Sequence, residues 1–271
     1  MAELRRDTDT AAALARLYDV DLLEDPGDLD LYLALASRVG GPILELAAGS
    51  GRLAIPLAEA GYEVTAVDID PAMLARLRTR AGESEPGTLG RVTPVHADLV
   101  GLELAGGARF RLAFVALNSI LLLSERETQQ AALATMARHL LAGGLAVIDA
   151  WLPGADELAR YDGRLGLEYV RDDPETGMVV TKIAGAQHEP VGNRVQLTCI
   201  YEEGEQGGTV RRWIRQDRLR LLGVEELRAM AESAGLEIEV MAGDYDLNPI
   251  GPHDERVILV ARRRGRPAPR P

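Results

Sequence analysis

The chain has 271 residues, of which 46% are hydrophobic and 27% charged, the composition of a globular protein with a substantial core. Its formal net charge of −12 disfavours nucleic acid as the main partner. No stretch resembles a membrane span or a signal peptide, so we expect a cytoplasmic protein without membrane contact. A single cysteine, Cys199, excludes an internal disulfide and a thiolate metal cluster, and the scattered histidines predict no metal site.

The N-terminal segment is expected to be helical. Residues 10–39 carry apolar side chains at helical spacing, interrupted by Pro26 and Gly27. This pattern predicts a helical lid over residues 1–41. Tyr18 and Tyr32 stand out within it, although composition alone favours half-buried core positions for both.

Residues 43–53, ILELAAGSGRL, read as a buried strand, a tight turn and the start of a helix. Gly49 and Gly51 bracket the turn. Glycine allows positive φ and close approach of a ligand, so the exposed amides at the helix start can bind polar groups. An isolated glycine pair is often an ordinary turn, and the meaning of this one depends on its context.

From Gly61 to residue 150 the pattern alternates between strand and helix. Ser124 and Glu127 predict a capping box for the helix at 125–141, and Gly143 and Gly144 are expected to end that helix. The expected strands after the first lie at 63–68, 91–98, 110–117 and 145–150, with an earlier helix at 72–80. Repeated βα units with right-handed crossovers predict an α/β, doubly wound, Rossmann-like sheet.

After Trp151 the pattern changes to strand-like runs at 167–171, 178–184, 194–202 and 210–221. They predict an antiparallel β appendage inserted after the fifth strand, over residues 155–218. Val195, Leu197, Cys199 and Tyr201 alternate to one face of its third strand, and Arg211, Trp213 and Arg215 share a face on the fourth. We expect this appendage to cover the acceptor of the reaction and to form a homodimer contact.

The remaining segments complete the predicted domains. A helix at 223–235 and strands at 236–240 and 255–261 return to the main sheet, so residues 42–154 and 219–263 are expected to form one cofactor-binding domain. The basic, proline-rich residues 264–271 are expected to be a disordered tail.

One carboxylate lies where a nucleotide-like cofactor would need it. Asp68 follows Gly49 by 19 residues, at the expected end of the second strand, where it can accept hydrogen bonds from two ribose hydroxyls. Nicotinamide enzymes share this spacing. Three further features separate the two classes: Glu45 ahead of the glycines, the sequence HADL at 96–99, and the paired strands near the C-terminus.

With these features the chain resembles the class I S-adenosylmethionine-dependent methyltransferases, and within them the small-molecule N-methyltransferases of glycine and aminosugars. The matching stretches are Tyr18-Asp19, ELAAGSGRLAIPLAEAGYEVTAVDIDPAML, Asn118-Ser119, the long strand insertion and GDYD near the end. Ala47 stands where the family usually has its first glycine. Leu122 stands where relatives often carry a histidine.

The resemblance implies S-adenosylmethionine as the cofactor and S-adenosylhomocysteine as its product. Glu45, Ala47 and Gly49 would contact the methionine part of the cofactor, and Asp68 would bind its ribose. The adenine would lie against Ile69, Met73, Asp98 and Leu99. Asn118 would lie beneath the sulfonium. With Tyr18 and Gly51, the expected cofactor-binding set is Tyr18, Glu45, Ala47, Gly49, Gly51, Asp68, Ile69, Met73, Asp98, Leu99 and Asn118. The expected acceptor residues are Tyr201, Trp213 and Arg215.

The expected activity is methyl transfer to a small-molecule acceptor, with N-methylation slightly favoured over O-methylation. An in-line attack on a sulfonium methyl depends mainly on positioning, and the hydroxyl of Tyr18 is our choice for the group that holds the methyl. Two alternatives stay open from the residues: a nicotinamide-dependent oxidoreductase and a catalytically silent cofactor-binding protein.

Overall fold

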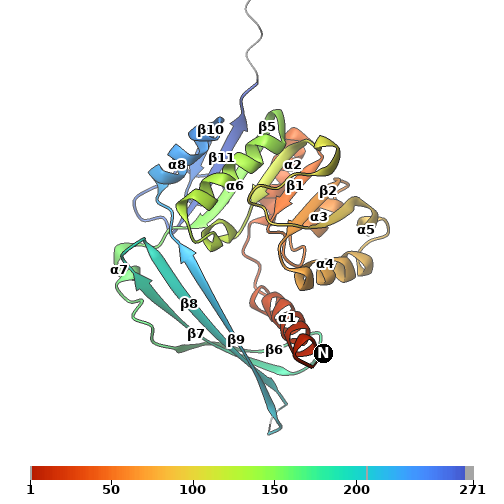
Figure 1. Ribbon diagram of the computed structural model, residues 1–271, viewed down its shortest axis with the longest axis vertical. Helices are drawn as coiled ribbons and strands as arrows, with labels where there is room; N and C mark the ends of the chain where they lie inside the picture. Colours follow the sequence, from red (N-terminus) through yellow and green to blue (C-terminus); the bar gives the residue numbers. More distant parts are fainter. Residues whose placement is uncertain (1, 206, 266–271) are drawn as a thin grey trace, which may run out of the picture. The chain divides into compact units, whose positions relative to one another are not determined.

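The computed structural model describes residues 2–205 and 207–265 and divides the chain into two compact units, each built from two segments (Figure 1). Of the described residues, 26–152 and 222–265 form the seven-stranded unit, and 2–25, 153–205 and 207–221 form the antiparallel unit. The expected N-terminal lid of residues 1–41 is therefore divided, because the helices on either side of Pro26 pack in different units. Most of the expected tail, from residue 266 onward, lies outside the described residues.

The seven-stranded unit contains a mixed sheet in the order β10-β11-β5-β4-β1-β2-β3. Its strands are β1 (Ile43–Leu46), β2 (Val64–Asp68), β3 (Val92–His96), β4 (Phe110–Val115), β5 (Leu140–Trp151), β10 (Leu236–Ala242) and β11 (Arg256–Arg263). Its helices are α2 (Leu29–Val39), α3 (Ala54–Glu59), α4 (Pro71–Glu83), α5 (Thr88–Arg91), α6 (Arg126–His139) and α8 (Val224–Ser233), with short 3₁₀ turns η1 (Ala105–Gly107) and η2 (Ser119–Leu122). The predicted doubly wound sheet is confirmed.

The strand order fixes the place at which this sheet can bind a ligand. The chain runs outward from β1 through β2 to β3 and then returns to β4, which pairs with β1 on its other side, parallel to it. The topological switch point thus lies between β1 and β4. In such sheets, ligands bind outside the carboxyl ends of the strands at this point.

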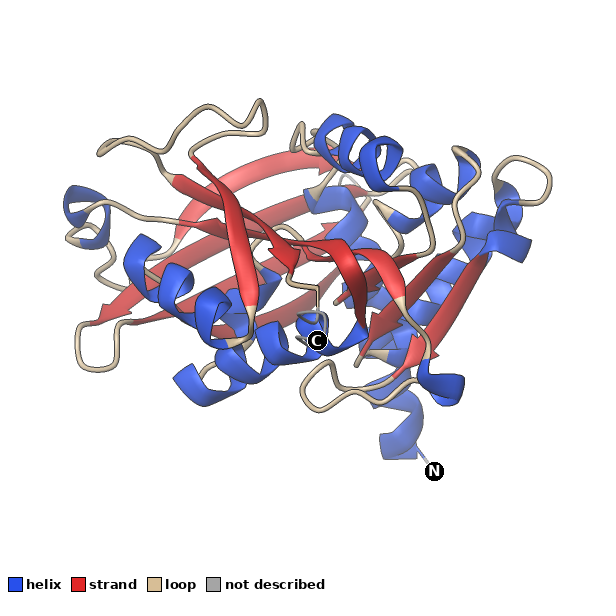
Figure 2. Ribbon diagram, turned by 90° about the horizontal axis from the view of Figure 1, so that it is seen from above, coloured by secondary structure: helices blue, strands red, loops and turns tan. Residues whose placement is uncertain are grey.

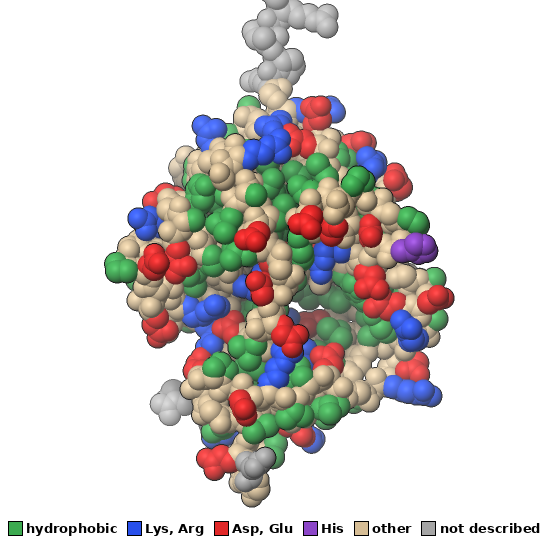
Figure 3. Space-filling model, turned by 180° about the vertical axis from the view of Figure 1, so that it is seen from behind, with side chains coloured by type: hydrophobic (Ala, Val, Ile, Leu, Met, Phe, Trp, Pro, Cys, Tyr) green, Lys and Arg blue, Asp and Glu red, His purple; other side chains and the backbone are tan. Residues whose placement is uncertain are grey.

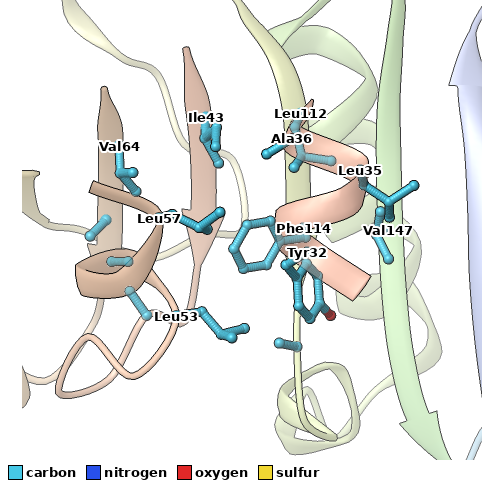
Figure 4. Close-up of a cluster of buried hydrophobic side chains, with 14 of the residues drawn as sticks. Tyr32, Leu35, Ala36, Ile43, Leu53, Leu57, Val64, Leu112, Phe114 and Val147 are labelled. Atoms are coloured by element: carbon cyan, nitrogen blue, oxygen red, sulfur yellow. The ribbon is translucent and has the colours of Figure 1, made fainter. Parts of the chain in front are cut away.

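The core of the seven-stranded unit lies between the sheet and the helices beside it (Figure 4). The four residues of β1 are all buried, as expected of a central parallel strand covered on both faces. Tyr32 of α2 is fully buried, with its ring centroid 4.4 Å from that of Phe114 in β4. This agrees with the core position that composition favoured for Tyr32.

The antiparallel unit is a four-stranded sheet in the order β6-β7-β8-β9, packed against α1 (Ala2–Asp21). Its strands are β6 (Gly166–Asp172), β7 (Val179–Glu189), β8 (Arg194–Gly204) and β9 (Val210–Arg220), with a short helix α7 (Ala155–Leu158) ahead of them. Leu17 and Val20 of α1 form a core cluster with Val180, Cys199 and Tyr201 of the sheet. This packing explains why α1 belongs with the appendage.

The predicted ends of α6 differ from the observed ones. The helix begins at Arg126 with Glu125 as its N-cap, one residue after Ser124, which the sequence predicts as the cap. Gly143 and Gly144 do not stop the helix, because β5 already begins at Leu140 and contains both. A Cβ at Gly144 would lie 3.0 Å from the carbonyl oxygens of Arg111 and Leu141, which shows that close strand packing requires this glycine.

The outer surfaces of the units are mixed in character. The sheets carry helices and loops around them (Figure 2), and acidic and basic side chains are spread over the face drawn in Figure 3. Within the described ranges, none of the helices combines the length and apolar character needed to cross a bilayer.

Candidate functional site

The turn after β1 lies at the switch point of the seven-stranded sheet, where the topology predicts a ligand crevice. Ala47, Gly49 and Gly51 have φ values of 58°, 56° and 85°, all in the left-handed region. The alanine that replaces the usual first glycine thus adopts a glycine-like conformation. Gly51 is needed for packing, because a Cβ there would lie 2.9 Å from Leu77 Cγ and 3.2 Å from Ile55.

Asp68, at the end of β2, holds this turn. Its Oδ2 accepts a hydrogen bond from Gly49 N at 2.7 Å, and its Oδ1 accepts one from Asp70 N at 2.8 Å. Each carboxylate oxygen keeps a second lone pair, so two further donors can be bound. Burial raises the pKa of Asp68, and the hydrogen bonds from the two backbone amides partly offset this effect by lowering the pKa.

Glu45, at the base of the turn, is a buried carboxyl group with a free oxygen. It is 4% exposed, and its Oε2 has no hydrogen-bond partner in the described structure. Burial raises its pKa to about 8, although the nearby Arg52 lowers it. Arg52 itself forms a bidentate ion pair with the fully buried Asp28, in which Arg52 Nη2 lies 2.7 Å from Asp28 Oδ2. Sequence reasoning missed this pair.

The residues expected around an adenine lie at the ends of β2 and β3. Asp68 is paired in register with His96, whose Nε2 lies 3.0 Å from the carbonyl oxygen of Ile69. The side chain of Ile69 is 66% exposed, which is unusual for a large apolar residue. Asp98 is exposed and accepts a hydrogen bond from Val100 N at 2.8 Å, so it stabilises its own turn. Met73, in the first turns of α4, and Leu99 are half-buried.

The turn after β4 forms the opposite side of the switch point. Asn118 has a φ of 67°, and its Oδ1 accepts a hydrogen bond from Trp151 N at 2.6 Å. The backbone N–H of Asn118 donates a hydrogen bond to the backbone carbonyl oxygen of Asp149 at 3.1 Å. Asp149 of β5 is fully buried and was not singled out from the sequence. The available signal was a carboxylate within the apolar strand LAVIDAW, since a buried charge requires partners.

The other expected residues lie in the antiparallel unit. Tyr201 is 3% exposed, and its hydroxyl donates to Asp21 Oδ2 at 2.7 Å. Asp21, the last residue of α1, also accepts hydrogen bonds from Tyr169 at 2.5 Å and from Lys182 at 3.1 Å. Tyr201 is thus committed to fixing α1 on the sheet, a placement that gives no support to its expected contact with an acceptor.

The side chain of Trp213 is more exposed than that of Tyr201, the residue of β8 with which Trp213 of β9 is paired. With Met178, Arg16 and Glu203 it lines a cavity of about 430 Å³ between α1 and the sheet. Arg215 lies on the same face of β9, and its Nε is 2.7 Å from Asp217 Oδ2. Tyr18 is half-buried on α1. The described residues contain no group of three or more His, Cys, Asp or Glu side chains that could hold a metal ion.

Comparison with known proteins adds an independent view of this site. Residues 43–144 match a family model described as a methyltransferase domain. The chain is 28% identical over 228 residues to a cypemycin N-terminal methyltransferase from a Streptomyces species, covering 83% of this chain and 84% of the relative. It is 24% identical over 242 residues to dTDP-3-amino-3,6-dideoxy-alpha-D-glucopyranose N,N-dimethyltransferase from Streptomyces fradiae, covering 87% and 88%.

A solved structure extends the similarity to both units. The CcbJ methyltransferase from Streptomyces caelestis is 27% identical and superposes with a TM-score of 0.74, covering 88% of this chain and 96% of the other. The similarity therefore includes the residues beyond the matched domain.

Proposed function

Because this chain is an S-adenosylmethionine-dependent methyltransferase, we propose that it methylates an amine of a small molecule. The observation that supports cofactor binding is the buried, unpartnered oxygen of Glu45 beside a glycine turn at the switch point. Two relatives are named as N-methyltransferases, which favours an amine over a hydroxyl acceptor. The methyltransferase match does not favour a nicotinamide enzyme.

The residues of the crevice suit S-adenosylmethionine, which supplies an electrophilic methyl group on a sulfonium. Glu45 would accept a hydrogen bond from its ammonium group through the free oxygen. Asp68 would bind two ribose hydroxyls through its remaining lone pairs, and the exposed Ile69, with Met73, would cover the adenine. The assignments of Ala47, Gly49, Gly51, Asp98, Leu99 and Asn118 stay predictions from the resemblance.

The chain's part in the reaction would be positioning. An amine that reaches the site unprotonated attacks the methyl directly, so no covalent intermediate on the protein is required. Tyr18 is our proposal for the hydroxyl that orients the methyl. A general base is not needed for this route, which agrees with Leu122 in place of the histidine of many relatives.

Calorimetry tests the cofactor assignment first. S-adenosylmethionine or S-adenosylhomocysteine should bind in the micromolar range, and NAD should not bind. Methyl transfer is then measured with matched amine and alcohol acceptors of the same carbon skeleton. Binding of NAD alone would overturn the proposal, and activity only on the alcohols would overturn its amine part. Binding without transfer to any acceptor would favour the silent alternative.

We further propose that the antiparallel unit binds the acceptor. Trp213 lines its cavity, and a ring face of this kind attracts a cationic amine. The lining also carries Asp9 and Glu203, whose charges are balanced by Arg211 and by Arg16, the ion-pair partner of Glu203. Trp213→Ala with Arg215→Ala should raise the acceptor KM while leaving cofactor affinity unchanged. A double variant with unaltered KM would remove both side chains from the acceptor site.

Homodimer formation through the outer face of the antiparallel sheet is the second part of this proposal. Leu167, Ile183, Ile200 and Ile214 lie at one level across its four strands, on the face opposite the α1 core cluster. Leu167 and Ile214 are 65% and 58% exposed. A solvated sheet face normally carries polar side chains, so a continuous aliphatic row favours a partner.

Size and charge make a second copy of this chain suitable. Three of the strands have 11 residues, so the face measures about 36 by 19 Å, and two copies would bury about 1,400 Å², the standard size of an interface. Three carboxylates and four arginines give the face a net charge of +1, far from the −12 of the whole chain. These are Asp172, Glu189, Glu202, Arg194, Arg212, Arg218 and Arg220.

Light scattering tests this surface. Ile214→Asp should convert a dimer to a monomer, and Val191→Asp is the matched control, because Val191 is 89% exposed but lies in the turn before β8. A monomeric wild type, or a dimeric Ile214→Asp variant, would remove the outer face as an interface. A cytoplasmic location stays a prediction from composition.

A further inference from the structure

Asp149 connects three parts of the seven-stranded unit through one buried carboxylate. Its Oδ2 accepts hydrogen bonds from Leu117 N at 3.1 Å and from the Tyr245 hydroxyl at 3.0 Å. Its Oδ1 pairs with the guanidinium of Arg256, the first residue of β11. The carboxylate therefore joins β5, the turn after β4, and the 243–255 loop between β10 and β11.

The turn that Asp149 holds has an unfavourable backbone conformation. Leu117 and Asn118 have φ values of 47° and 67°, a region that side chains other than glycine rarely adopt, and leucine has no local hydrogen bond to offset it. Both backbone N–H groups of the turn donate hydrogen bonds to Asp149. The N–H of Leu117 donates to the carboxylate, and the N–H of Asn118 donates to the backbone carbonyl oxygen. Asn118 Oδ1 then accepts from Trp151 N, two residues further along β5.

The topology places this turn where it matters for binding. β4 lies beside β1 at the switch point, so the turn after β4 faces the same crevice as the glycine turn after β1. Asp68 fixes the glycine turn through Gly49 N, and Asp149 fixes the other side through Leu117 N. Both sides of the crevice are thus held by a carboxylate that accepts a hydrogen bond from a left-handed turn.

We propose that Asp149 is a positioning residue, which with Tyr245 and Arg256 holds the Leu117–Asn118 turn in the shape that binds the cofactor. The proposal rests on the proposed function, because it needs S-adenosylmethionine in this crevice. The guanidinium carbon of Arg256 lies 5.0 Å from the centre of the Tyr245 ring. Tyr245 of the loop and Arg256 of β11 therefore also stabilise each other through a cation–π contact. The 243–255 loop thereby acts on the crevice without having to touch the cofactor.

Calorimetry with S-adenosylhomocysteine measures the effect without depending on turnover. Tyr245→Phe removes one hydroxyl bond and should weaken binding by about three- to tenfold. Asp149→Asn, which leaves Arg256 without its charged partner, should weaken binding more, by about 10- to 100-fold. Glu239→Gln is the matched control: it removes the carboxylate that binds Arg262, another arginine of β11, away from the turn, and should change binding less than twofold.

A rescue variant separates positioning from general stability. Glycine adopts positive φ freely, so Leu117→Gly in the Asp149→Asn background should recover at least about threefold of the lost affinity, and should not improve the wild type. If Asp149→Asn does not fold, Tyr245→Phe carries the test alone. Wild-type affinity in both variants, or equal losses in Tyr245→Phe and Glu239→Gln, would overturn the inference. Failure of the wild type to bind would instead overturn the proposed function.

Discussion

The two sheets of this protein place their buried charges differently. In the seven-stranded unit, Glu45 of β1 and Asp149 of β5 lie in the parallel part of the mixed sheet, on either side of β4 and toward the carboxyl ends of their strands. In the antiparallel unit, the buried Asp173 and Glu203 pair with Arg16 of α1, and the half-buried Asp21 accepts hydrogen bonds from Tyr169, Tyr201 and Lys182 of the sheet. A parallel sheet collects strand ends at one edge, where polar groups can meet a ligand. An antiparallel sheet has no such edge, and its polar groups here fix the helix that covers it.

The strongest test of this contrast is Asp68→Ala. Two charge-assisted hydrogen bonds to ribose hydroxyls are worth about 1.5 kcal/mol or more each, so cofactor affinity should fall by about 100-fold. Asp98→Ala would remove the hydrogen bond from Val100 N and the single expected contact with the adenine, so it should cost less, below about tenfold. An unchanged dissociation constant for Asp68→Ala, measured by calorimetry, would contradict the assignment of the crevice.

Asp21→Ala tests the antiparallel half of the comparison. It leaves two tyrosine hydroxyls and the Lys182 ammonium without their shared partner, and should destabilise the packing of α1 by about 2 kcal/mol. Alkylation of Cys199 is the measurement, because this thiol is buried and burial raises its pKa, which keeps it unreactive in the folded unit.

The alkylation rate should therefore rise in Asp21→Ala and rise less in Tyr201→Phe, which removes a single hydroxyl bond. Asp19→Ala, on the same helix turn, provides the comparison for a general effect on α1. An Asp21→Ala protein whose Cys199 reacts as slowly as in wild type would show that the carboxylate does not fasten the helix.

Glu45 should make the stability of the folded protein depend on pH. Its pKa of about 8 lies above the ordinary value of 4.5, so the folded protein keeps a proton that the unfolded chain has released between these pH values. The contribution of Glu45 to stability is therefore complete below about pH 4.5 and decreases as the pH rises to about 8. Glu45→Gln should remove this dependence.

Binding of the cofactor ammonium should lower the pKa of Glu45 and release close to one proton at pH 7. Calorimetry in buffers with different ionisation enthalpies measures that proton directly. Glu45→Gln should bind with little proton release. Equal release by the wild type and Glu45→Gln would place the ammonium elsewhere.

The smallest expected effect concerns Tyr18. If its hydroxyl orients the methyl group, Tyr18→Phe should lower kcat by about five- to tenfold and change cofactor affinity by less than twofold. Tyr62→Phe, in the seven-stranded unit, should leave both unchanged. Equal turnover in the wild type and Tyr18→Phe would return Tyr18 to an ordinary core position on α1.

The sequence was most informative where local pattern and spacing determine the structure. Buried runs such as ILEL predicted the strands, and the spacing of Gly49 and Asp68 predicted that both lie at the ends of strands, whereas the 2.7 Å hydrogen bond between them was not predicted. Alternation along β8 also placed Cys199 and Tyr201 on one buried face.

Partners far away in the sequence could not be predicted in this way. Tyr201 bonds to Asp21 across 180 positions, and Arg256 pairs with Asp149 across 107. Such pairings depend on the completed topology, and no spacing rule connects them. The same holds for Gly143 and Gly144, where helix-stop chemistry suggested a boundary but the packing of β5 against β4 decided the structure.

The division of the antiparallel unit between two chain segments has a consequence for synthesis. Helix α1 leaves the ribosome before the strands that bury Leu17 and Val20, which begin at residue 166 and end at residue 220. At about 5 to 20 residues per second, the apolar side of α1 waits roughly 10 to 40 seconds for its sheet. The seven-stranded unit, which needs its last strand β11, is also completed late. Nascent chains of this protein therefore expose an amphipathic helix until β9 has been made, the kind of segment that chaperones bind.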